Sequence, residues 1–314
     1  MNVLITGGAG FIGSHIAELL LQEHYRLIIV DNFSTGQKKF VPHGAIVYEV
    51  DLESPKLEEV FKKERPHIVF HLAAQVDVNR SIDQPISDAT TNILGTINLL
   101  NCCQKYQIKK IIYSSSSAVY GEPVDSSIAE SAPIAPSSFY GISKYVPELY
   151  LKTYFDLYGL EYAILRYANV YGPRQSASGE GGVVSIFCHK LLNGDTPSIY
   201  GDGEQTRDFV FVKDVAKANV LAIQNGTNET FNISCNESVS INQLYRMLAE
   251  LTKSKHRPNY QADRKGDIRH SRLNNQKAQE KLYWSPTFNI MMGLTETVAY
   301  YQNDCWAKSK VSEP

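Results

Sequence analysis

Cysteine is scarce in this sequence, long apolar runs are absent, and neither sign of charge is in excess. The five cysteines are odd in number and show no C-x-x-C spacing, which argues against a disulfide framework or a zinc ribbon and favours a reducing cytoplasm. No apolar run approaches the roughly 18 to 20 residues that span a bilayer, and no basic leader precedes the first apolar segment. We therefore expect a soluble, unprocessed cytoplasmic protein with no membrane partner.

The sequence also lacks an excess of basic residues that would bind nucleic acid, and it lacks a spacing pattern typical of metal ligands. The 31 lysines and arginines are balanced by 33 acidic residues, for a formal net charge of −2, so we expect a small-molecule partner and no nucleic acid. His67 and His71 are four residues apart but fall in an expected strand, where that spacing does not converge on an ion. No H-E-x-x-H motif or Cys/His cluster occurs, and we predict no metal.

The first half of the chain alternates between short apolar runs and helix-period stretches. This alternation predicts an α/β fold with a doubly wound parallel sheet, because each crossover helix packs back onto the sheet. Two stretches predict long helices, residues 86–107 and a second that ends at Gly159. The expected strands are residues 2–6, 27–30, 45–50, 67–74, 109–115 and 161–166.

The pattern changes after Arg166 into a stretch rich in Gly, Pro and Ser, "NVYGPRQSASGEGGVV". We expect a nucleotide-binding domain over residues 1–169, joined by part of 207–225, and a smaller α/β substrate-binding lobe over residues 170–314.

Three glycines, Gly7, Gly10 and Gly13, lie between the first strand and a helix in "ITGGAGFIGSH". A turn in this position presents the free N–H groups and the positive dipole end of the helix, which suit a pyrophosphate. The alternative is a tight glycine-rich turn without a ligand.

A carboxylate at the end of the second strand, Asp31, favours a dinucleotide, because it can bind both ribose hydroxyls and would repel a 2′-phosphate. We predict NAD rather than NADP on a Rossmann-type sheet. Asp51 either reaches the adenine or caps a helix.

Tyr140 and Lys144 are four residues apart in "YGISK", after the serine-rich segment "YSSSSAVYGE". On a helix they share a face, so the ammonium can lower the phenol pKa and bond the nicotinamide ribose. A phenolate of this kind is a general base. Alternatively, the two side chains share a solvated helical face.

In their order along the chain these motifs resemble the extended short-chain dehydrogenase/reductases, and specifically the UDP-glucose (UDP-galactose) 4-epimerase family. The resemblance covers nearly the whole length through "TGGAGFIGSH", "HLAAQ", "SSSSAVYG", "YGISK", "LRYANVYGPRQ", "GDGEQTRDFVFVKDVA" and "RKGDIRHS". It implies transient oxidation at sugar C4 with tightly bound NAD, a UDP-hexose substrate and a homodimer, with a role in galactose metabolism.

The resemblance also assigns the cofactor site and the catalytic residues. Tyr140 is the expected base, Lys144 its electrostatic partner, and Ser116 the hydroxyl that bonds the same sugar oxygen, with Ser117 as the alternative. The expected cofactor contacts are Gly7, Gly10, Phe11, Ile12, Gly13, Asp31, Asn32, Asp51, Leu52, Leu72, Ala73, Ala74, Gln75, Ser114, Tyr140, Lys144 and Tyr167.

Substrate contacts follow from the same resemblance. Arg207 and Arg264 would bind the UDP pyrophosphate, because two guanidinium forks suit that double anion. Asn169 is expected to contact the diphosphate, and the backbone near Val183 to line the nucleotide. Tyr200 is expected beside the uracil and Asp267 at its ribose.

Ser271 stands seven residues after Arg264, at the family position near the sugar C2 substituent. Family members with tyrosine there tend to exclude N-acetyl groups, and a serine leaves room for them. We expect activity on UDP-N-acetylglucosamine and UDP-N-acetylgalactosamine as well as on the plain hexoses. The alternative is that Ser271 only caps a turn.

Two features of the long helix before Gly159 add expectations. Pro147 removes a backbone hydrogen bond inside the helix and predicts a kink there. Tyrosines at positions 150, 154 and 158 form a stripe that fits either the core or a dimer interface, in which the family packs this helix and 86–107 into a four-helix bundle.

Other activities remain as alternatives. A UDP-glucuronate 4-epimerase or decarboxylase is compatible with these motifs, and so is a non-catalytic NAD(H) sensor. A 4,6-dehydratase is disfavoured, because Ser117 and Ala118 stand where that family has an Asp-Glu pair.

Overall fold

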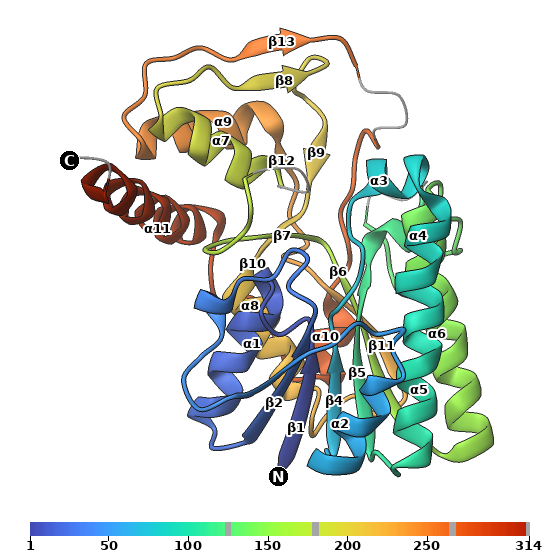
Figure 1. The fold of residues 1–314 in the computed structure, drawn as a ribbon. Coiled ribbons are helices and arrows are strands. Elements are labelled where there is room, and N and C mark those ends of the chain that lie inside the picture. The colour runs from blue at the N-terminus through green and yellow to red at the C-terminus, as the bar shows by residue number, and fades with distance from the viewer. Residues whose placement is uncertain (123–126, 178–181, 264–267, 312–314) are drawn as a thin grey trace.

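The computed structural model describes residues 1–122, 127–177, 182–263 and 268–311. A seven-stranded sheet forms its centre, in the order β11-β6-β5-β4-β1-β2-β3, and every neighbouring pair is parallel (Figure 1). The predicted Rossmann-type sheet is therefore confirmed. Its strands are β1 Asn2–Thr6, β2 Arg26–Asp31, β3 Ile46–Glu49, β4 Ile68–His71, β5 Lys110–Ser116, β6 Glu161–Tyr167 and β11 Glu229–Ile233.

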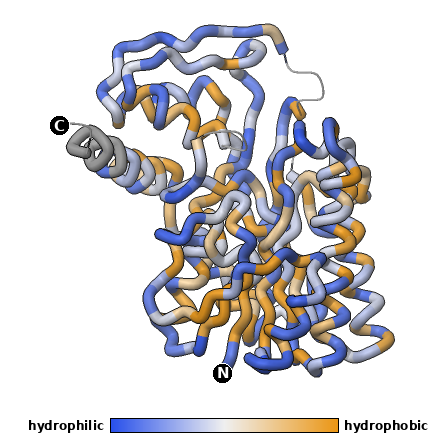
Figure 2. Tube along the Cα trace, in the orientation of Figure 1, coloured by the Kyte–Doolittle hydropathy of each residue, from blue (hydrophilic) through white to orange (hydrophobic). Residues whose placement is uncertain are grey.

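Helices cover both faces of the sheet, because alternate strand residues point to opposite sides. Val3 and Ile5 pack with the helices of one face, while Leu4 packs with those of the other. The first face carries α1 Phe11–Gln22, α8 Val212–Leu221 and α10 Gln276–Lys281. The second carries α2 Lys56–Glu64, α5 Gly95–Lys105 and α6 Phe139–Tyr158. Figure 2 shows the apolar strands between these more polar outer surfaces.

A second group of elements lies beyond the carboxyl ends of the strands (Figure 1). Its core contains Phe187, Phe211, Leu244 and Leu294. The elements are β7 Asn169–Tyr171, α7 Val183–Leu192, β8 Ser198–Tyr200, β9 Thr206–Arg207, β10 Phe209–Phe211, β12 Val239–Ser240, α9 Ile241–Leu251, β13 Asn259–Gln261 and α11 Ile290–Val311.

The chain returns from this second group to the sheet. The edge strand β11 and helices α8 and α10 come from residues beyond 207, yet they complete the sheet and one of its covering layers. The division at residues 169 and 170 stays a prediction, and any such division has to assign these later segments to the sheet.

The two long predicted helices differ in regularity. Residues 86–107 form three joined segments, α4 Pro85–Ala89, a π-helical turn η2 at Thr90–Leu94, and α5. Helix α6 begins at its cap Ser138, which accepts a hydrogen bond from Gly141 N, and ends at Gly159 in the left-handed conformation (φ 73°). It continues through Pro147 to Tyr158. The remaining short helices are η1 Lys38–Phe40, α3 Val78–Asp83 and η3 Ser117–Tyr120.

No helix in the described part of the chain is long and apolar enough to cross a membrane.

Candidate active site

The turn between β1 and α1 leaves no space for a side chain at Gly7 or Gly13. Gly7 has a φ of +71°, and a Cβ there would lie 2.7 Å from Ala73 N. A Cβ on Gly13 would lie 2.1 Å from Gly7 O. Gly10 caps α1 without a side-chain hydrogen bond, so the first N–H groups of the helix are left for an anion. Phe11 and Ile12 form that first turn. The turn therefore fits a pyrophosphate.

Asp31 ends β2 beside this turn. One carboxylate oxygen accepts from Ala9 N at 2.9 Å and the other from Phe33 N at 2.8 Å, which fixes the side chain next to the glycines. Burial raises the pKa of Asp31, although both hydrogen bonds oppose that shift. A Cβ on Gly36 would lie 2.8 Å from an Asp31 oxygen, so the loop passes directly over the carboxylate.

Asp51 lies beside the same strand end. Asn32 Nδ2 donates to Asp51 Oδ1 at 2.8 Å, whereas α2 starts after Pro55 and has no side-chain cap. The helix-cap alternative for Asp51 is therefore wrong, and its place beside Asn32 is compatible with the cofactor role.

The segment after β4 carries the next expected contacts, from Leu72 to Gln75. Ala73 N donates to Thr6 O at 3.1 Å, which brings this segment to the end of β1, at the point where the strand order reverses. Ligands of open α/β sheets bind at such a point. Gln75 is held by Asn92 and Asp88, while Leu52 packs against Gly95 and Ala74 continues the segment.

Lys144 lies on α6 one helical turn after Tyr140, and its side chain is buried, with 4% of its surface exposed. No hydrogen bond to its ammonium is present among the described residues. Its Nζ lies 4.6 Å from the ring centre of Tyr113. Burial lowers the pKa of Lys144 to about 8, against the opposing charges of Glu148 and Asp88. The solvated-face alternative is therefore wrong for Lys144, whereas Tyr140 is partly exposed.

The serine run ends β5 and each described hydroxyl has a different environment. Ser114 Oγ bonds the hydroxyl of Tyr167 at 2.8 Å, and Ser115 Oγ donates to Glu148 Oε1 at 2.6 Å. Ser116 Oγ accepts from Ala118 N at 3.2 Å and caps η3. Ser116 is thus the serine at the strand end, which favours it over Ser117.

Sequence reasoning missed the buried ion pair between Glu148 and Arg166, whose charged atoms are 2.6 Å apart. Glu148 continues the four-residue spacing of Tyr140 and Lys144 along α6. That spacing was the available signal, because a third charged residue on one helical face predicts a shared buried environment.

Three expected substrate contacts lie close together along the backbone. Asn169 begins β7, and its N–H donates to Asp208 O, next to Arg207 in β9. Ser271 N donates to Thr206 O at 3.2 Å, so Ser271 also lies beside Arg207. No side-chain hydrogen bond of Ser271 occurs within the described ranges, which does not support the turn-cap alternative.

The other substrate contacts are more dispersed. Tyr200 ends β8, and its carbonyl accepts from Gln205 just before β9. Val183 is the first residue of α7. Arg264 and Asp267 lie outside the described residues.

His71 takes part in buried hydrogen bonds next to Lys144. Its ring nitrogens bond Thr6 Oγ1 and Thr96 Oγ1, both at 2.8 Å. Burial and the charge of Lys144 lower the pKa of His71 to about 3. Across the described residues no group of three or more His, Cys, Asp or Glu side chains could hold a metal ion.

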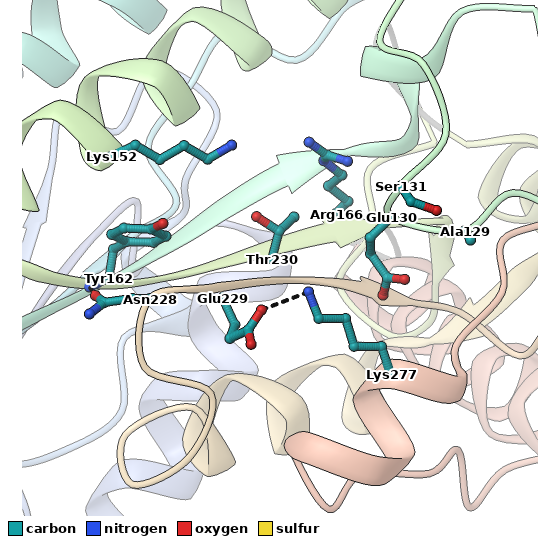
Figure 3. Close-up of a pocket in the computed structure, with 10 residues that line it drawn as sticks. All are labelled: Ala129, Glu130, Ser131, Lys152, Tyr162, Arg166, Asn228, Glu229, Thr230 and Lys277. Carbon is teal, nitrogen blue, oxygen red and sulfur yellow. Dashed lines mark hydrogen bonds and ion pairs between the residues drawn. The ribbon is translucent and has the colours of Figure 1, made fainter.

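A cavity of about 460 Å³ lies elsewhere, along the edge strand β11 (Figure 3). Lys152 of α6 and Arg166 of β6 line one side, and Lys277 of α10 pairs with Glu229 on the other. None of the residues expected to bind cofactor or substrate lines this cavity.

Comparisons with known proteins point to one group. The model of the NAD dependent epimerase/dehydratase family matches residues 3–234. The UDP-glucose 4-epimerase of Mycolicibacterium smegmatis is 37% identical over 311 residues, which cover 96% of this chain and 99% of that protein.

Two solved structures extend the likeness to nearly the whole fold. UDP-glucose 4-epimerase from Thermotoga maritima, with UDP-glucose, is 46% identical with a TM-score of 0.96, covering 97% of this chain and 100% of its own. UDP-N-acetylglucosamine 4-epimerase from Methanobrevibacter ruminantium, in complex with UDP-N-acetylmuramic acid, is 38% identical with a TM-score of 0.92, covering 96% and 98%.

Proposed function

Because this chain belongs to the NAD dependent epimerase/dehydratase family, we propose that it interconverts UDP-glucose and UDP-galactose, with NAD retained through the cycle. The enzyme is then an isomerase, since the sugar is oxidised and reduced at the same carbon and no net redox change results. The glycine turn, Asp31 and the free N–H groups in the first turn of α1 fit NAD.

Lys144 is the observation that carries the chemistry. A buried ammonium is unfavourable unless an anion or a hydrogen-bond acceptor comes to it. Tyr140 lies one turn away on the same helix, and the nearby charge favours its phenolate, which can take a proton from the sugar 4-hydroxyl. The same ammonium can bond a ribose hydroxyl of the cofactor.

The remaining steps follow from the residues around that hydroxyl. Ser116 donates a hydrogen bond to the sugar O4 while Tyr140 holds the proton. NAD bound at the glycine turn would supply the acceptor and then the donor of the C4 hydride. Tyr140 returns the proton after the 4-keto sugar has turned its other face, so protons and hydride balance over the cycle.

Arg207 and Arg264 would hold the UDP pyrophosphate throughout this rotation, with Asn169 beside it. The backbone near Val183 lines the nucleotide, Tyr200 flanks the uracil and Asp267 bonds its ribose. Retention of the nucleotide is what lets the keto sugar turn without leaving.

A wider substrate range is a second part of the proposal. Ser271 presents a small side chain beside Arg207, and a small residue near C2 leaves room for an acetamido group. The likeness to a UDP-N-acetylglucosamine 4-epimerase supports this range. Plain hexoses still bind through the same nucleotide contacts.

We also propose a homodimer formed by the helical face of α4, η2, α5 and α6. This face exposes large apolar side chains, which monomeric proteins rarely group together. They include Ile86 (82% exposed), Leu94, Leu149, Tyr150 and Leu157 (66% exposed). We further propose that the enzyme acts in galactose metabolism. A cytoplasmic location is favoured because the four cysteines whose side chains are described are free thiols.

Incubation of purified protein with UDP-galactose and no added NAD tests the activity. We expect UDP-glucose to form until the two sugars reach equilibrium. Parallel incubation with UDP-glucuronate separates the alternatives, because epimerised uronate or released CO₂ there, with UDP-galactose unchanged, would replace the proposal. Bound NAD with no product from any of these sugars would instead indicate a sensor.

A further inference from the structure

Glu148 and Arg166 form a buried ion pair behind the expected catalytic residues. Glu148 has no exposed surface and Arg166 is 3% exposed. Arg166 Nε donates to Glu148 Oε1 at 2.9 Å, and Nη2 donates to Oε2 at 2.6 Å, so the contact is bidentate. The pair joins α6 to β6, the strand next to β5 in the sheet.

The same pair also binds the chain on both sides of Ser116. Ser115 Oγ donates to Glu148 Oε1 at 2.6 Å. Tyr120 OH accepts from Arg166 Nη1 at 2.9 Å. Ser116 lies between these two attachments, at the end of β5, and its position therefore depends on the pair.

Glu148 also belongs to the catalytic helix. It follows Lys144 by one turn and Tyr140 by two, on the same face of α6. The groups facing the Lys144 ammonium are Glu148 on its own helix and, from the elements packed against α6, Asp88 of α4, His71 of β4 and Tyr113 of β5. Glu148 and Asp88 are the acidic members of this set.

We propose that the Glu148–Arg166 pair is a positioning element that holds Ser116 in register with Tyr140 and Lys144 and supplies negative charge beside Lys144. The inference rests on the proposed function for its catalytic consequence. Its geometric part, the attachment of residues 115–120 to α6, stands independently of any substrate.

The chain contains a matched control for this pair. Glu64 is 5% exposed, pairs with the half-exposed Arg26, and accepts from the hydroxyl of Tyr48, so it combines a buried acid, a guanidinium and a phenol away from the site. Glu64 lies at the end of α2, beside the first residue of β2. It is therefore near the amino ends of the strands, whereas the site lies at their carboxyl ends.

Glu148→Gln and Glu64→Gln are compared in steady-state kinetics across pH and in thermal melting. Glu148→Gln loses the more stability, because it leaves the buried Arg166 without its carboxylate, whereas the Arg26 side chain is 47% exposed and stays hydrated in Glu64→Gln. Only Glu148→Gln is expected to lose about 10²-fold in kcat with little change in KM, as misplacement of a catalytic group does. The alkaline limb of the profile of kcat against pH moves to lower pH in this variant, because loss of the negative charge makes Lys144 release its proton more readily.

Ser115→Ala and Tyr120→Phe give the same test with the ion pair intact. Each removes one attachment and keeps both charges, so kcat falls several-fold while the alkaline limb stays in place. Amide hydrogen exchange, measured without substrate, should be faster over residues 115–120 in these variants and in Glu148→Gln, and unchanged there in Glu64→Gln.

Unchanged exchange over residues 115–120 in all three site variants overturns the positioning role, even if wild-type protein converts no UDP-sugar. An inactive wild type with faster exchange in the variants contradicts only the proposed function. In an active enzyme, an unmoved alkaline limb in Glu148→Gln, or equal losses of kcat in Glu64→Gln, overturns the inference. If Glu148→Gln does not fold, Ser115→Ala and Tyr120→Phe decide it.

Discussion

The Lys144 ammonium is buried, which is costly for a positive charge, beside the ring of Tyr113 and two acidic groups, Glu148 on the next turn of α6 and Asp88 on α4. Burial lowers the pKa of Lys144 to about 8. Lys144 is therefore still mostly protonated at neutral pH, but a small change of pKa or pH alters its charge. A residue in this state responds strongly to what binds beside it. At the residue scale, the site is therefore best tested by changes that remove one group and leave its neighbours in place.

Tyr140→Phe removes only the expected proton acceptor. We predict a loss of about 10²- to 10⁴-fold in epimerisation, because a positioned acid/base contributes about that much. Bound NAD, measured from the absorbance of the released nucleotide, should stay near the wild-type amount. Near-normal turnover in this variant would refute the assignment of Tyr140.

Asp31 predicts a strong preference for NAD over NADP, because a buried carboxylate beside a 2′-phosphate repels it. Replacement by serine, together with Asn32→Arg, should raise the affinity for NADP while lowering that for NAD. Binding is measured by titration of the cofactor-free protein. Equal affinity of the wild type for both cofactors contradicts this role.

Ser271→Tyr should remove activity on the N-acetylated substrates and keep most activity on UDP-glucose and UDP-galactose, because the ring fills the space for an acetamido group. Ser271→Ala is the control and should keep both. The ratio of kcat/KM for the two substrate pairs is the measurement. Equal losses on both pairs, or a wild type inactive on UDP-N-acetylglucosamine, would count against the proposed gate.

At the element scale, the sequence predicted the first six strands and α6 because each has a local signal. The strands are short apolar runs bounded by turns, and α6 has the cap Ser138 at its start and Gly159 at its end. The π turn Thr90–Leu94 was not predictable, because its apolar spacing is that of an ordinary helix. β11 joins the sheet through pairing with β6, a long-range contact with no local signature.

The same limit applies to the site. The glycines, Asp31, Tyr140 and Lys144 could be assigned roles from the sequence because their spacing carries a mechanism, and those roles stay predictions. The pairing of Glu148 with Arg166 was not found, since the two residues lie on different elements and meet only after β5 and β6 align. Asp88 likewise reaches Lys144 only through the packing of α4 on α6.

The apolar face of α4 to α6 predicts that the dimer can be weakened selectively. Leu157→Glu with Ile86→Glu places charges in the proposed interface and should shift the protein towards monomer, as measured by light scattering at several concentrations. Tyr283→Glu, which changes an equally exposed aromatic side chain (75% exposed) outside these helices, is the control. A wild type that is already monomeric at every concentration argues against this interface.

At the scale of the whole molecule, two buried histidines couple folding to pH. Burial, with Arg174 nearby, lowers the pKa of His15 to about 4, and its Nε2 bonds Pro173 O at 3.0 Å. His71 has its pKa lowered to about 3. Because the folded-state pKa values lie below the usual 6.5, the unfolded chain binds more protons between about pH 4 and 6.5, so stability is lost as pH falls through that window.

His15→Gln should flatten this part of the stability curve. The shift of His15 corresponds to about 3 kcal/mol at neutral pH that disappears by about pH 4. Thermal melting from pH 4.5 to 7.5 compares the slopes of the two proteins. A variant with the wild-type slope would show that His15 is not a source of the acid sensitivity.

The core on one face of the sheet contains Val3 and Ile5 together with Trp284, whose indole N–H bonds Asp214 O. The first strand and the last buried residue of this core layer are therefore about 280 residues apart, an interval of about 14 to 56 s of ribosomal synthesis at about 5 to 20 residues per second. Until α8, β11 and α10 have been synthesised in turn, this face of the nascent sheet is covered only in part, by α1. Nascent chains arrested before residue 284 should accordingly be cleaved readily by protease in the strands of β1 and β2, and protection should appear only when Trp284 has left the ribosome.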